Sequence, residues 1–454
     1  MKAILTLLTI LTSTLFLSAQ EGVVISNDSL HKEIEQVKKD VATLNNLKVT
    51  GWIQAQFQFA ESRGVANFDG GNFAANSDKR FMIRRGRIKF TYNGKNTQYV
   101  MQLNGTERGL NLTEIYLTVT DPWKKVFSIT AGVMNRPFGF EIDQSSAVRE
   151  SPERSRYTQI LMPNERDLGA KIVFMPSKKS KFNGLRLDAG FYNGQGVYVP
   201  GTTTPASPSG AVLYQQGAAP VLGVNEFDFN KDFIGRLSYY KTLKGEKMKI
   251  GIGASHYNGG NTYQTNRVYG SIVTNDNGYK DWQVKDTAQK TYKNKVAPRI
   301  YYGCEAFVSY QSILGTTTLR GEYIQGTQPG ISSSSSSPFF LPTAGATYIR
   351  NFQGMYAYFI HRIGKTKHEL VAKYEFYDPN TKVSGNDIVG GGKNSFTAAD
   401  IKYTQLGLGY NYYYDANVKF MFTYNIITNE KTQLSGYTSD IKDNILTVRM
   451  QYRF

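Results

Sequence analysis

The sequence lacks the residues from which disulfides, metal centres and nucleotide sites are usually built. Cys304 is the single cysteine in 454 residues, so no internal disulfide can form, and we expect it to pack as a small apolar residue on a strand. The histidines show no metal-ligand spacing, and no phosphate-binding loop or dinucleotide fingerprint is present, so we expect no cofactor and no metal. The histidines are His31, His256, His361 and His368.

Acidic residues are the scarcer charge. There are 53 Lys and Arg against 36 Asp and Glu, which gives a net charge of +17. In a soluble protein this excess favours nucleic acid or an anionic surface as partner, and in a pore it favours anions. A mean hydropathy of −0.39 gives no membrane signal, but lipid-facing and lumen-facing residues of a membrane barrel alternate and average out. Composition alone does not decide between these classes.

Long apolar runs are missing except at the N-terminus. Met1 and Lys2 are followed by AILTLLTILTSTLFLSA, which has no charge and ends on small residues. This pattern predicts a secretory signal peptide over residues 1–19, cut after Ala19. The run is too short and too rich in threonine to predict a membrane span, and no later segment has the character of a spanning helix.

The segment after the signal predicts a helix. Leu30, Ile34, Val37, Val41, Leu44 and Leu47 follow one another at steps of three or four residues, with Glu and Lys between them. This spacing is close to a heptad repeat. Two interpretations stay open for Leu30–Leu47: an amphipathic helix docked on its own protein, or a short coiled coil between copies. We assign residues 20–48 to a helical segment in the periplasm.

From residue 49 onward, apolar and polar residues alternate in sixteen segments, most of them 8 to 12 residues long. Strict alternation places the two faces of a strand in different environments. The length suits tilted strands that cross a bilayer, and an even number is typical of bacterial barrels. The segments are 49–59, 81–92, 97–104, 112–120, 126–134, 168–175, 184–192, 232–241, 247–257, 299–310, 315–325, 352–363, 367–377, 402–413, 417–427 and 444–454.

The connections between these segments alternate in length. Tight turns such as NGKN, DPWKK, TLKGE and DAN follow even-numbered segments. Long polar connections follow odd-numbered ones, such as Glu61–Arg80, Asn193–Lys231, Asn258–Pro298 and Gly326–Asn351. This rule predicts an all-β fold over residues 49–454: a 16-stranded antiparallel transmembrane β-barrel with short turns toward the periplasm. The terminal Phe454 resembles the recognition end that outer-membrane barrels present to their assembly machinery.

The third long connection, Asn135–Asp167, is dense in charges of both signs. It lies between the strand FSITAGVM and the strand LGAKIVFM. A charged connection of this length within a β pattern is more often functional than idle. We expect it to fold inward and narrow the bore.

The faces of the strands predict a basic lumen. Ile88, Phe90 and Tyr92 share an apolar outward face, so the residues between them point inward. The cations placed inward by this test are Arg85, Arg87, Lys89, Lys171, Arg186, Arg236, Lys249, Arg320, Lys373, Lys419 and Arg449. The inward acids are Glu114, Asp188, Glu305, Glu322 and Glu375, with a diagonal pair expected between Arg320 and Glu322. A wall with this excess attracts anions and repels cations.

At these residues the sequence resembles the phosphate-selective porin O/P family. The resemblance rests on RRGRIKF (Arg84–Phe90), GVMNRPFGFEIDQSS (Gly132–Ser146) and RDLGAKI (Arg166–Ile172). It implies a trimer of sixteen-stranded barrels, each with its third loop in the pore, which pass phosphate or polyphosphate along Arg and Lys. By position it implies wall cations at Arg85, Arg87 and Lys89. On the loop it implies candidate cations at Arg149, Arg154 and Arg156.

One feature departs from a phosphate filter. Residues 135–167 hold five Arg but six acids, so the loop is not net positive, and we expect much of its charge to be paired internally. Several unpaired cations would have to converge on one oxyanion. The acids are Glu141, Asp143, Glu150, Glu153, Glu165 and Asp167. The walls therefore support anion preference, while phosphate as the solute is implied by the resemblance.

The sequence predicts an outer-membrane porin for small anions, in contact with lipid, assembled as a homotrimer and without nucleic acid. Two alternatives stay open: a non-conducting structural or adhesive barrel, and a general porin without phosphate specificity. We do not expect an enzyme. A hydrolase would need a Ser or Thr nucleophile beside a histidine, and His361 and His368 fall near a predicted short turn.

Overall fold

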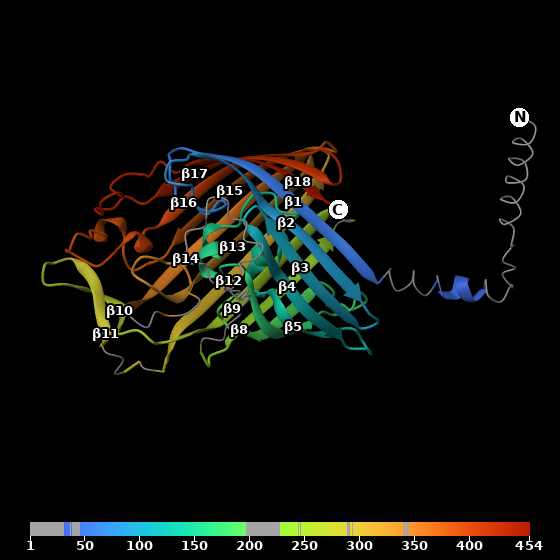
Figure 1. Ribbon diagram of the computed structural model, residues 1–454, viewed down its shortest axis with the longest axis horizontal. Helices are drawn as coiled ribbons and strands as arrows, with labels where there is room; N and C mark the ends of the chain where they lie inside the picture. The colour runs from blue at the N-terminus through green and yellow to red at the C-terminus, as the bar shows by residue number, and fades with distance from the viewer. Residues whose placement is uncertain are drawn as a thin grey trace, which may run out of the picture. The chain divides into compact units, whose positions relative to one another are not determined.

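The alternating segments form strands that join into one sheet, shown in Figure 1. The computed structural model describes residues 31–36, 38, 46–196, 228–243, 245, 247–287, 291–292, 294–338, 341 and 345–454. The strands are β1 (Leu47–Ala60), β2 (Lys79–Asn93), β3 (Thr97–Thr106), β4 (Gly109–Thr120), β5 (Phe127–Asn135), β6 (Arg166–Phe174), β7 (Leu185–Tyr192), β8 (Asp232–Leu243), β9 (Met248–Thr262), β10 (Arg267–Thr274), β11 (Lys280–Thr287), β12 (Val296–Ser312), β13 (Gly315–Gly330), β14 (Ala346–Ile363), β15 (His368–Asp378), β16 (Tyr403–Tyr413), β17 (Val418–Asn429) and β18 (Ile445–Arg453).

The sheet closes on itself. β1 pairs antiparallel with β18, with Phe57 opposite Val448, and it also pairs with β2. β9 pairs directly with β12, so β10 and β11 are left outside the ring. Eighteen strands less these two leave a barrel of sixteen, as the sequence predicts. Each predicted segment corresponds to one barrel strand.

β10 and β11 were not predicted, because the whole stretch Asn258–Pro298 reads as a polar connection. They form a hairpin whose β10 pairs in parallel with the start of β14, with Arg267 opposite Ala346. The hairpin extends beyond the barrel wall in Figure 1. Its strands are short and largely polar, and its register shifts near Tyr269, so regular alternation does not mark them.

The N-terminal segment forms a separate unit, residues Met1–Lys48. Residues 31–36 and 38 are helical, which agrees with part of the predicted helix. The last predicted helical residue, Leu47, instead begins β1. The proposed signal peptide over residues 1–19 lies outside the described residues, as does most of the near-heptad pattern.

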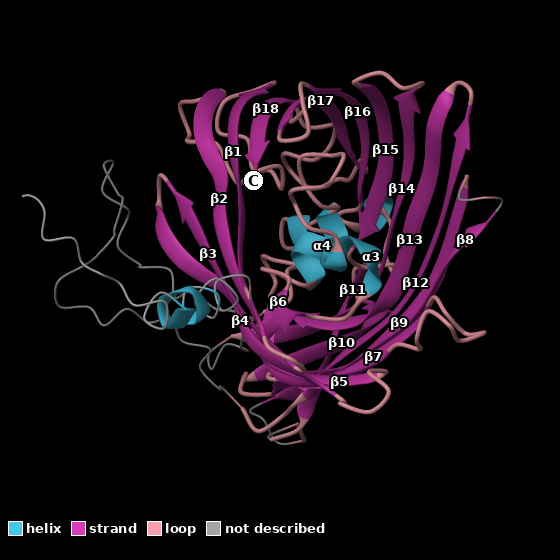
Figure 2. Ribbon diagram, turned by 90° about the vertical axis from the view of Figure 1, so that its right-hand side faces the viewer, coloured by secondary structure: helices cyan, strands magenta, loops and turns pink. Residues whose placement is uncertain are grey.

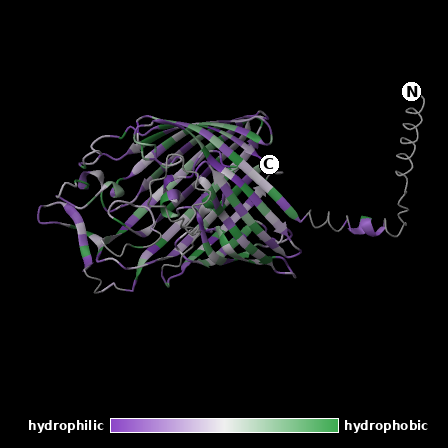
Figure 3. Ribbon diagram, viewed as in Figure 1, coloured by the Kyte–Doolittle hydropathy of each residue, from purple (hydrophilic) through white to green (hydrophobic). Residues whose placement is uncertain are grey.

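The outer wall is apolar where strands face away from the lumen. Leu117, Ile129 and Ile252 are exposed on this face, and Figure 3 shows hydrophobic and hydrophilic residues alternating along the strands. Such a band matches the lipid-facing surface of a membrane barrel. Cys304 lies on β12 and is exposed on the same outward surface. No helix in the described part of the chain has the length and apolar character needed to span a bilayer.

The short turns are closed by side chains of turn-forming residues. In the DPWKK turn, both carboxylate oxygens of Asp121 accept hydrogen bonds from four backbone N–H groups, those of residues 124–127, at 2.7 to 3.0 Å. Lys125 adopts a φ of 55° in this turn. The carboxylate thus replaces sheet hydrogen bonds where the chain reverses.

The connection between β5 and β6 enters the barrel. It carries two short helices, α3 (Gly139–Asp143) and α4 (Arg156–Leu161), and Figure 2 shows both inside the ring of strands. This confirms the predicted inward fold. An apolar cluster fixes the loop to one side of the bore. In it Phe138 packs edge-on against Tyr301 at 6.3 Å, and Tyr157 stacks on Tyr356 at 6.2 Å.

The long connections lie together at the end of the barrel opposite the short turns. Trp282 of β11, Tyr348 of β14, and Ile388 and Phe396 of the β15–β16 connection form a second apolar cluster. The β15–β16 connection contains the 3-10 helices η1 (Gly385–Asp387) and η2 (Ala398–Asp400). This packing gives the long-connection end a small core of its own.

Candidate functional site

The inserted loop is held by one carboxylate that binds three arginines. Glu153 lies 2.9 Å from Nε of Arg84, 2.8 Å from Nη2 of Arg85 and 2.7 Å from Nη2 of Arg449. Burial alone would raise the pKa of Glu153, but these guanidinium groups outweigh it and hold the pKa well below its usual range. Arg85 therefore points inward as predicted, but its charge is used to anchor the loop.

Two further wall arginines bind loop carboxylates. Arg236 of β8 lies 2.7 Å from Asp143, and Arg320 of β13 lies 2.9 Å from Glu150. The predicted diagonal pair between Arg320 and Glu322 is wrong, because the inserted loop supplies a carboxylate that sequence neighbours on the strand do not reveal. The expected internal pairing of the loop is also incomplete, since half of its acids bind the wall.

Glu322 has a different role. Its carboxylate accepts hydrogen bonds from the backbone N–H of Glu141, at 2.7 Å, and from the hydroxyl of Tyr356. Gly139 begins α3 with a φ of 65°, and a Cβ there would collide with Glu322. The wall carboxylate therefore fits closely against the start of α3, and only glycine meets both the backbone and the space requirement.

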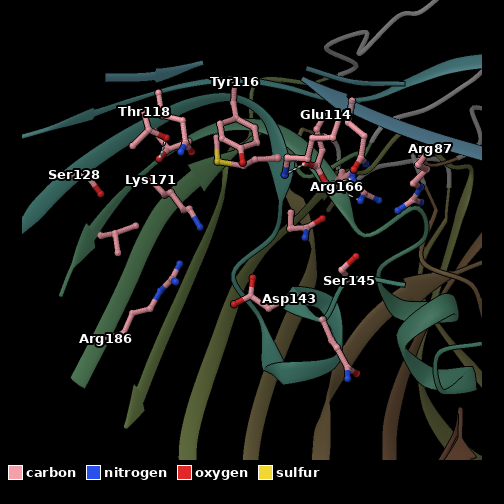
Figure 4. Close-up of a pocket in the computed structure, with 18 of the residues that line it drawn as sticks. Arg87, Glu114, Tyr116, Thr118, Ser128, Asp143, Ser145, Arg166, Lys171 and Arg186 are labelled. Carbon is pink, nitrogen blue, oxygen red and sulfur yellow. Dashed lines mark hydrogen bonds and ion pairs between the residues drawn. The ribbon is translucent and has the colours of Figure 1, made fainter. Parts of the chain in front are cut away.

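Two cavities of about 470 and 190 Å³ lie along β2 to β7, beside the inserted loop. We call them the large chamber and the small chamber, and the two together the passage. Figure 4 shows the large chamber with its charged residues projecting into it. Arg87 and Arg166 line both, so they mark the junction between them.

The charge of the passage is predominantly positive. The large chamber is lined by the cations Arg87, Lys89, Arg154, Arg166, Lys171 and Arg186, and by the acids Glu114 and Asp143. The small chamber adds Arg84 and Arg85, with Glu165 as its one acid. The predicted excess of cations is thus found in the passage itself.

Near the junction, one carboxylate is shared by two cations. Glu114 lies 2.8 Å from Nη2 of Arg166 and 3.2 Å from Nζ of Lys89. Arg166 also lies 3.0 Å from Glu165. Both cations keep N–H groups beyond these contacts, since a guanidinium has five donors and an ammonium three.

At the end of the large chamber away from the junction, the carboxylate of Asp188 on β7 is likewise shared by two cations. It lies 2.9 Å from Nζ of Lys171 and 2.6 Å from Nε of Arg186. Two cations on one carboxylate leave a net positive charge at this end as well.

Arg87 differs from the other chamber cations. Within the described residues no carboxylate binds it, and its Nε has no hydrogen-bond partner. Its guanidinium carbon lies 5.6 Å from the centre of the Trp52 ring. Arg87 therefore presents an uncompensated charge at the junction of the two chambers.

The three predicted loop cations do not converge. Arg154 forms an ion pair with Glu165 and donates to backbone carbonyls within residues 141–144. The guanidinium carbon of Arg156 lies 3.5 Å from the centre of the Tyr403 ring. Arg149 is buried, with a 2% exposed surface, and within the described residues its three guanidinium nitrogens have no hydrogen-bond partner. Of the three, Arg154 alone lines a chamber.

The remaining predicted wall cations lie away from the passage. Lys373 is 2.5 Å from Glu375, and Lys419 donates to the backbone carbonyl of Arg149 at 2.7 Å. Lys249 is exposed near the short turn that precedes β9.

The roles of two important residues were not predicted from the sequence. Arg166 was placed just before the predicted strand 168–175, whereas β6 begins at Arg166 itself and turns the side chain into the bore. Glu153 was counted only as a loop charge. The motif RDLGAKI contains the signal for Arg166, while the contacts of Glu153 depend on the folded loop. Within the described residues, no group of three or more His, Cys, Asp or Glu is arranged to hold a metal.

Comparison with known proteins gives one family match. Residues 349–454 match the family model "Phosphate-selective porin O and P", which confirms the expected resemblance over this part of the chain. The three stretches that carry the resemblance in the sequence lie outside the matched range. A search of curated protein sequences finds no match.

Several solved structures are distantly similar. An anion-selective porin from Comamonas acidovorans has 10% identity and a TM-score of 0.48, covering 90% of this chain and 99% of that one. A Salmonella typhi OmpF complex with daunomycin has 13% identity and a TM-score of 0.48, covering 90% and 97%. The outer membrane channel DcaP of Acinetobacter baumannii has 8% identity and a TM-score of 0.47, with the same coverage.

Proposed function

We propose that this protein is a porin of the bacterial outer membrane, a passive diffusion channel with a preference for anions. One observation carries the anion preference. The passage between the inserted loop and β2 to β7 is lined by six cations and two acids in its large chamber. A narrow bore with this balance concentrates anions and excludes cations.

The uncompensated charge of Arg87 and the shared charges around Glu114 and Asp188 act along the whole passage. Because cations lie at both ends of the large chamber, an anion that leaves one cation meets another. Several sites of moderate strength favour conduction over tight retention. Phosphate or polyphosphate as the solute is supported by the family match and not by any convergence of free cations.

Reversal potential in a planar bilayer under a salt gradient tests this function. We expect a potential of the sign that anion selectivity gives, and a block of chloride current by phosphate. A steady current without ion preference would instead indicate a general porin. Absence of any steady current would indicate a structural or adhesive barrel.

The location follows from the same proposal. Residues 1–19 would direct secretion, the helical segment within residues 20–48 would lie in the periplasm, and the short turns would face the same side. The long connections would then face outward. Protease added to intact cells should cut in long connections such as residues 331–345 between β13 and β14. Cleavage confined to the short turns would reverse the topology.

A further inference from the structure

We propose that the large chamber is a binding site for a hydroxylated organic anion of the size of a sugar phosphate. Its anionic group would lie at Arg87 and Arg166, and its hydroxyl groups along Thr118, Ser128 and Thr130. This inference rests on the proposed anion channel and specifies the solute that the channel favours.

The size of the chamber exceeds what a small inorganic anion needs. At about 470 Å³ the chamber is within the range of about 300–1,000 Å³ that is typical of small-molecule sites. Figure 4 shows Arg87 at one end and Ser128 at the other. A solute with a body as well as a charge can therefore contact both ends.

One wall of the chamber offers uncharged hydrogen-bonding groups. Thr118 of β4 and Thr130 of β5 face each other across the ladder, with their hydroxyl oxygens 2.9 Å apart. Ser128, two residues before Thr130 on the same strand, lines the chamber too. The threonine pair uses one donor and one acceptor, which leaves one donor and three acceptor positions. These groups are suited to the hydroxyls of a solute.

The large chamber also offers apolar surface for the carbon skeleton of a solute. Tyr116 lies between the two ends on β4, and the side chains of Met134, Val173 and Met175 add apolar surface to the chamber. Small-molecule sites typically combine an apolar lining with a few fixed polar groups. Bare phosphate would gain nothing from this surface.

The cations themselves argue against inorganic phosphate as the best-fitting solute. Tight phosphate sites use several charge-assisted hydrogen bonds that converge on one group. Here Lys89 and Arg166 already share Glu114, and within the described residues Arg87 alone among the chamber cations lacks a carboxylate partner. With only one unpaired cation among the described residues at the junction, beside Arg166, the remaining affinity must come from the body of the solute.

Block of chloride current in a planar bilayer tests the inference. The probes are glucose 6-phosphate, inorganic phosphate, tripolyphosphate, butyl phosphate and glucose, each added to the wild-type protein. We expect glucose 6-phosphate to block at about tenfold lower concentration than phosphate or butyl phosphate, as two net hydrogen bonds would give. Equal block by glucose 6-phosphate and phosphate, or stronger block by tripolyphosphate, would overturn the proposal.

A double variant locates the effect. T118V/T130V removes both hydroxyls with little change of shape and should lose most of the preference for glucose 6-phosphate, while phosphate block and reversal potential stay unchanged. The matched control is S309A/T318V, which removes another hydroxyl pair, 2.8 Å apart, from β12 and β13 outside the chambers. Ser128→Ala gives a second measurement if the double variant does not fold. A preference that survives both chamber variants would place the solute elsewhere.

The channel function and the assignment of its solute can be overturned separately. A wild-type reversal potential that shows no preference for anions would overturn the proposed anion channel. Retained anion selectivity without preference for the hydroxylated probe would overturn only the solute assignment.

Discussion

Arg85 and Arg87 lie two residues apart on one face of β2, yet only Arg85 reaches a carboxylate. Arg85 is 2.8 Å from Glu153 of the inserted loop, whereas Arg87 forms no ion pair within the described residues and has the Trp52 ring as a neighbour. The same residue type therefore anchors the loop at one position and charges the passage at the next. Their substitutions should have different effects.

Arg87→Gln should reduce anion selectivity without loosening the loop. A unit charge 4 Å from a permeating ion interacts with that ion by about 1 kcal/mol in bulk water. Removal of the Arg87 charge should therefore lower the ratio of anion to cation permeability by about fivefold. The measurement is reversal potential under a salt gradient. Arg85→Gln is the matched control, and it should change thermal stability more than selectivity. The separation would be wrong if both variants shifted the reversal potential equally.

Glu153→Gln should free the loop. The change leaves three guanidinium groups without a countercharge, and loss of one partner from a buried ion pair typically costs about 3–5 kcal/mol. We expect a lower unfolding temperature and a larger, noisier single-channel conductance. Glu107→Gln is the control, because Glu107 pairs with Arg108 at 3.5 Å on an exposed surface. Unchanged conductance would show that other contacts alone fix the loop.

Cys304 reports on the membrane-facing surface. It is exposed on the outward face of β12, so lipid should cover it in the native membrane. A water-soluble maleimide should leave it unlabelled on cells and label it after denaturation. The control is C304S/S333C, which moves the thiol to an exposed position in the β13–β14 connection and should label on cells. Rapid labelling of native Cys304 would contradict the proposed lipid contact.

The N-terminal segment should contribute to assembly. If the proposed trimer is correct, the mature protein should run as a trimer in mild detergent, and deletion of residues 26–46 should weaken it without preventing folding. The deletion ends at residue 46 because β1 begins at Leu47. Chemical cross-linking and light scattering measure the change. A monomer from the full mature chain would exclude the trimer.

The barrel was predictable because its signal is local. Alternation in a stretch such as Phe127–Asn135 follows from two different environments on the two faces of one strand, so every barrel strand left a pattern in the sequence. The same pattern placed Arg85, Arg87 and Lys89 inward. The β10–β11 hairpin escaped because neither of its faces is consistently apolar.

The pairing of charges was not predictable, because it depends on contacts between distant segments. Arg85 and Glu153 are 68 residues apart, and Arg449 and Glu153 are 296 apart. Nothing in the spacing of either residue reveals which wall arginine will meet a loop carboxylate. For Arg166 the error was smaller, since a strand boundary two residues too late was enough to hide it.

The contact between Arg449 and Glu153 has a consequence for the order of biogenesis. Arg449 belongs to β18, which follows the other barrel strands in the chain and must pair with β1 to close the ring. Until that seam forms, Glu153 lacks one of its three guanidinium partners. The anchoring of the inserted loop is therefore completed only after the cylinder is complete, and a barrel stalled before closure would be open at its side and would hold the loop by fewer contacts.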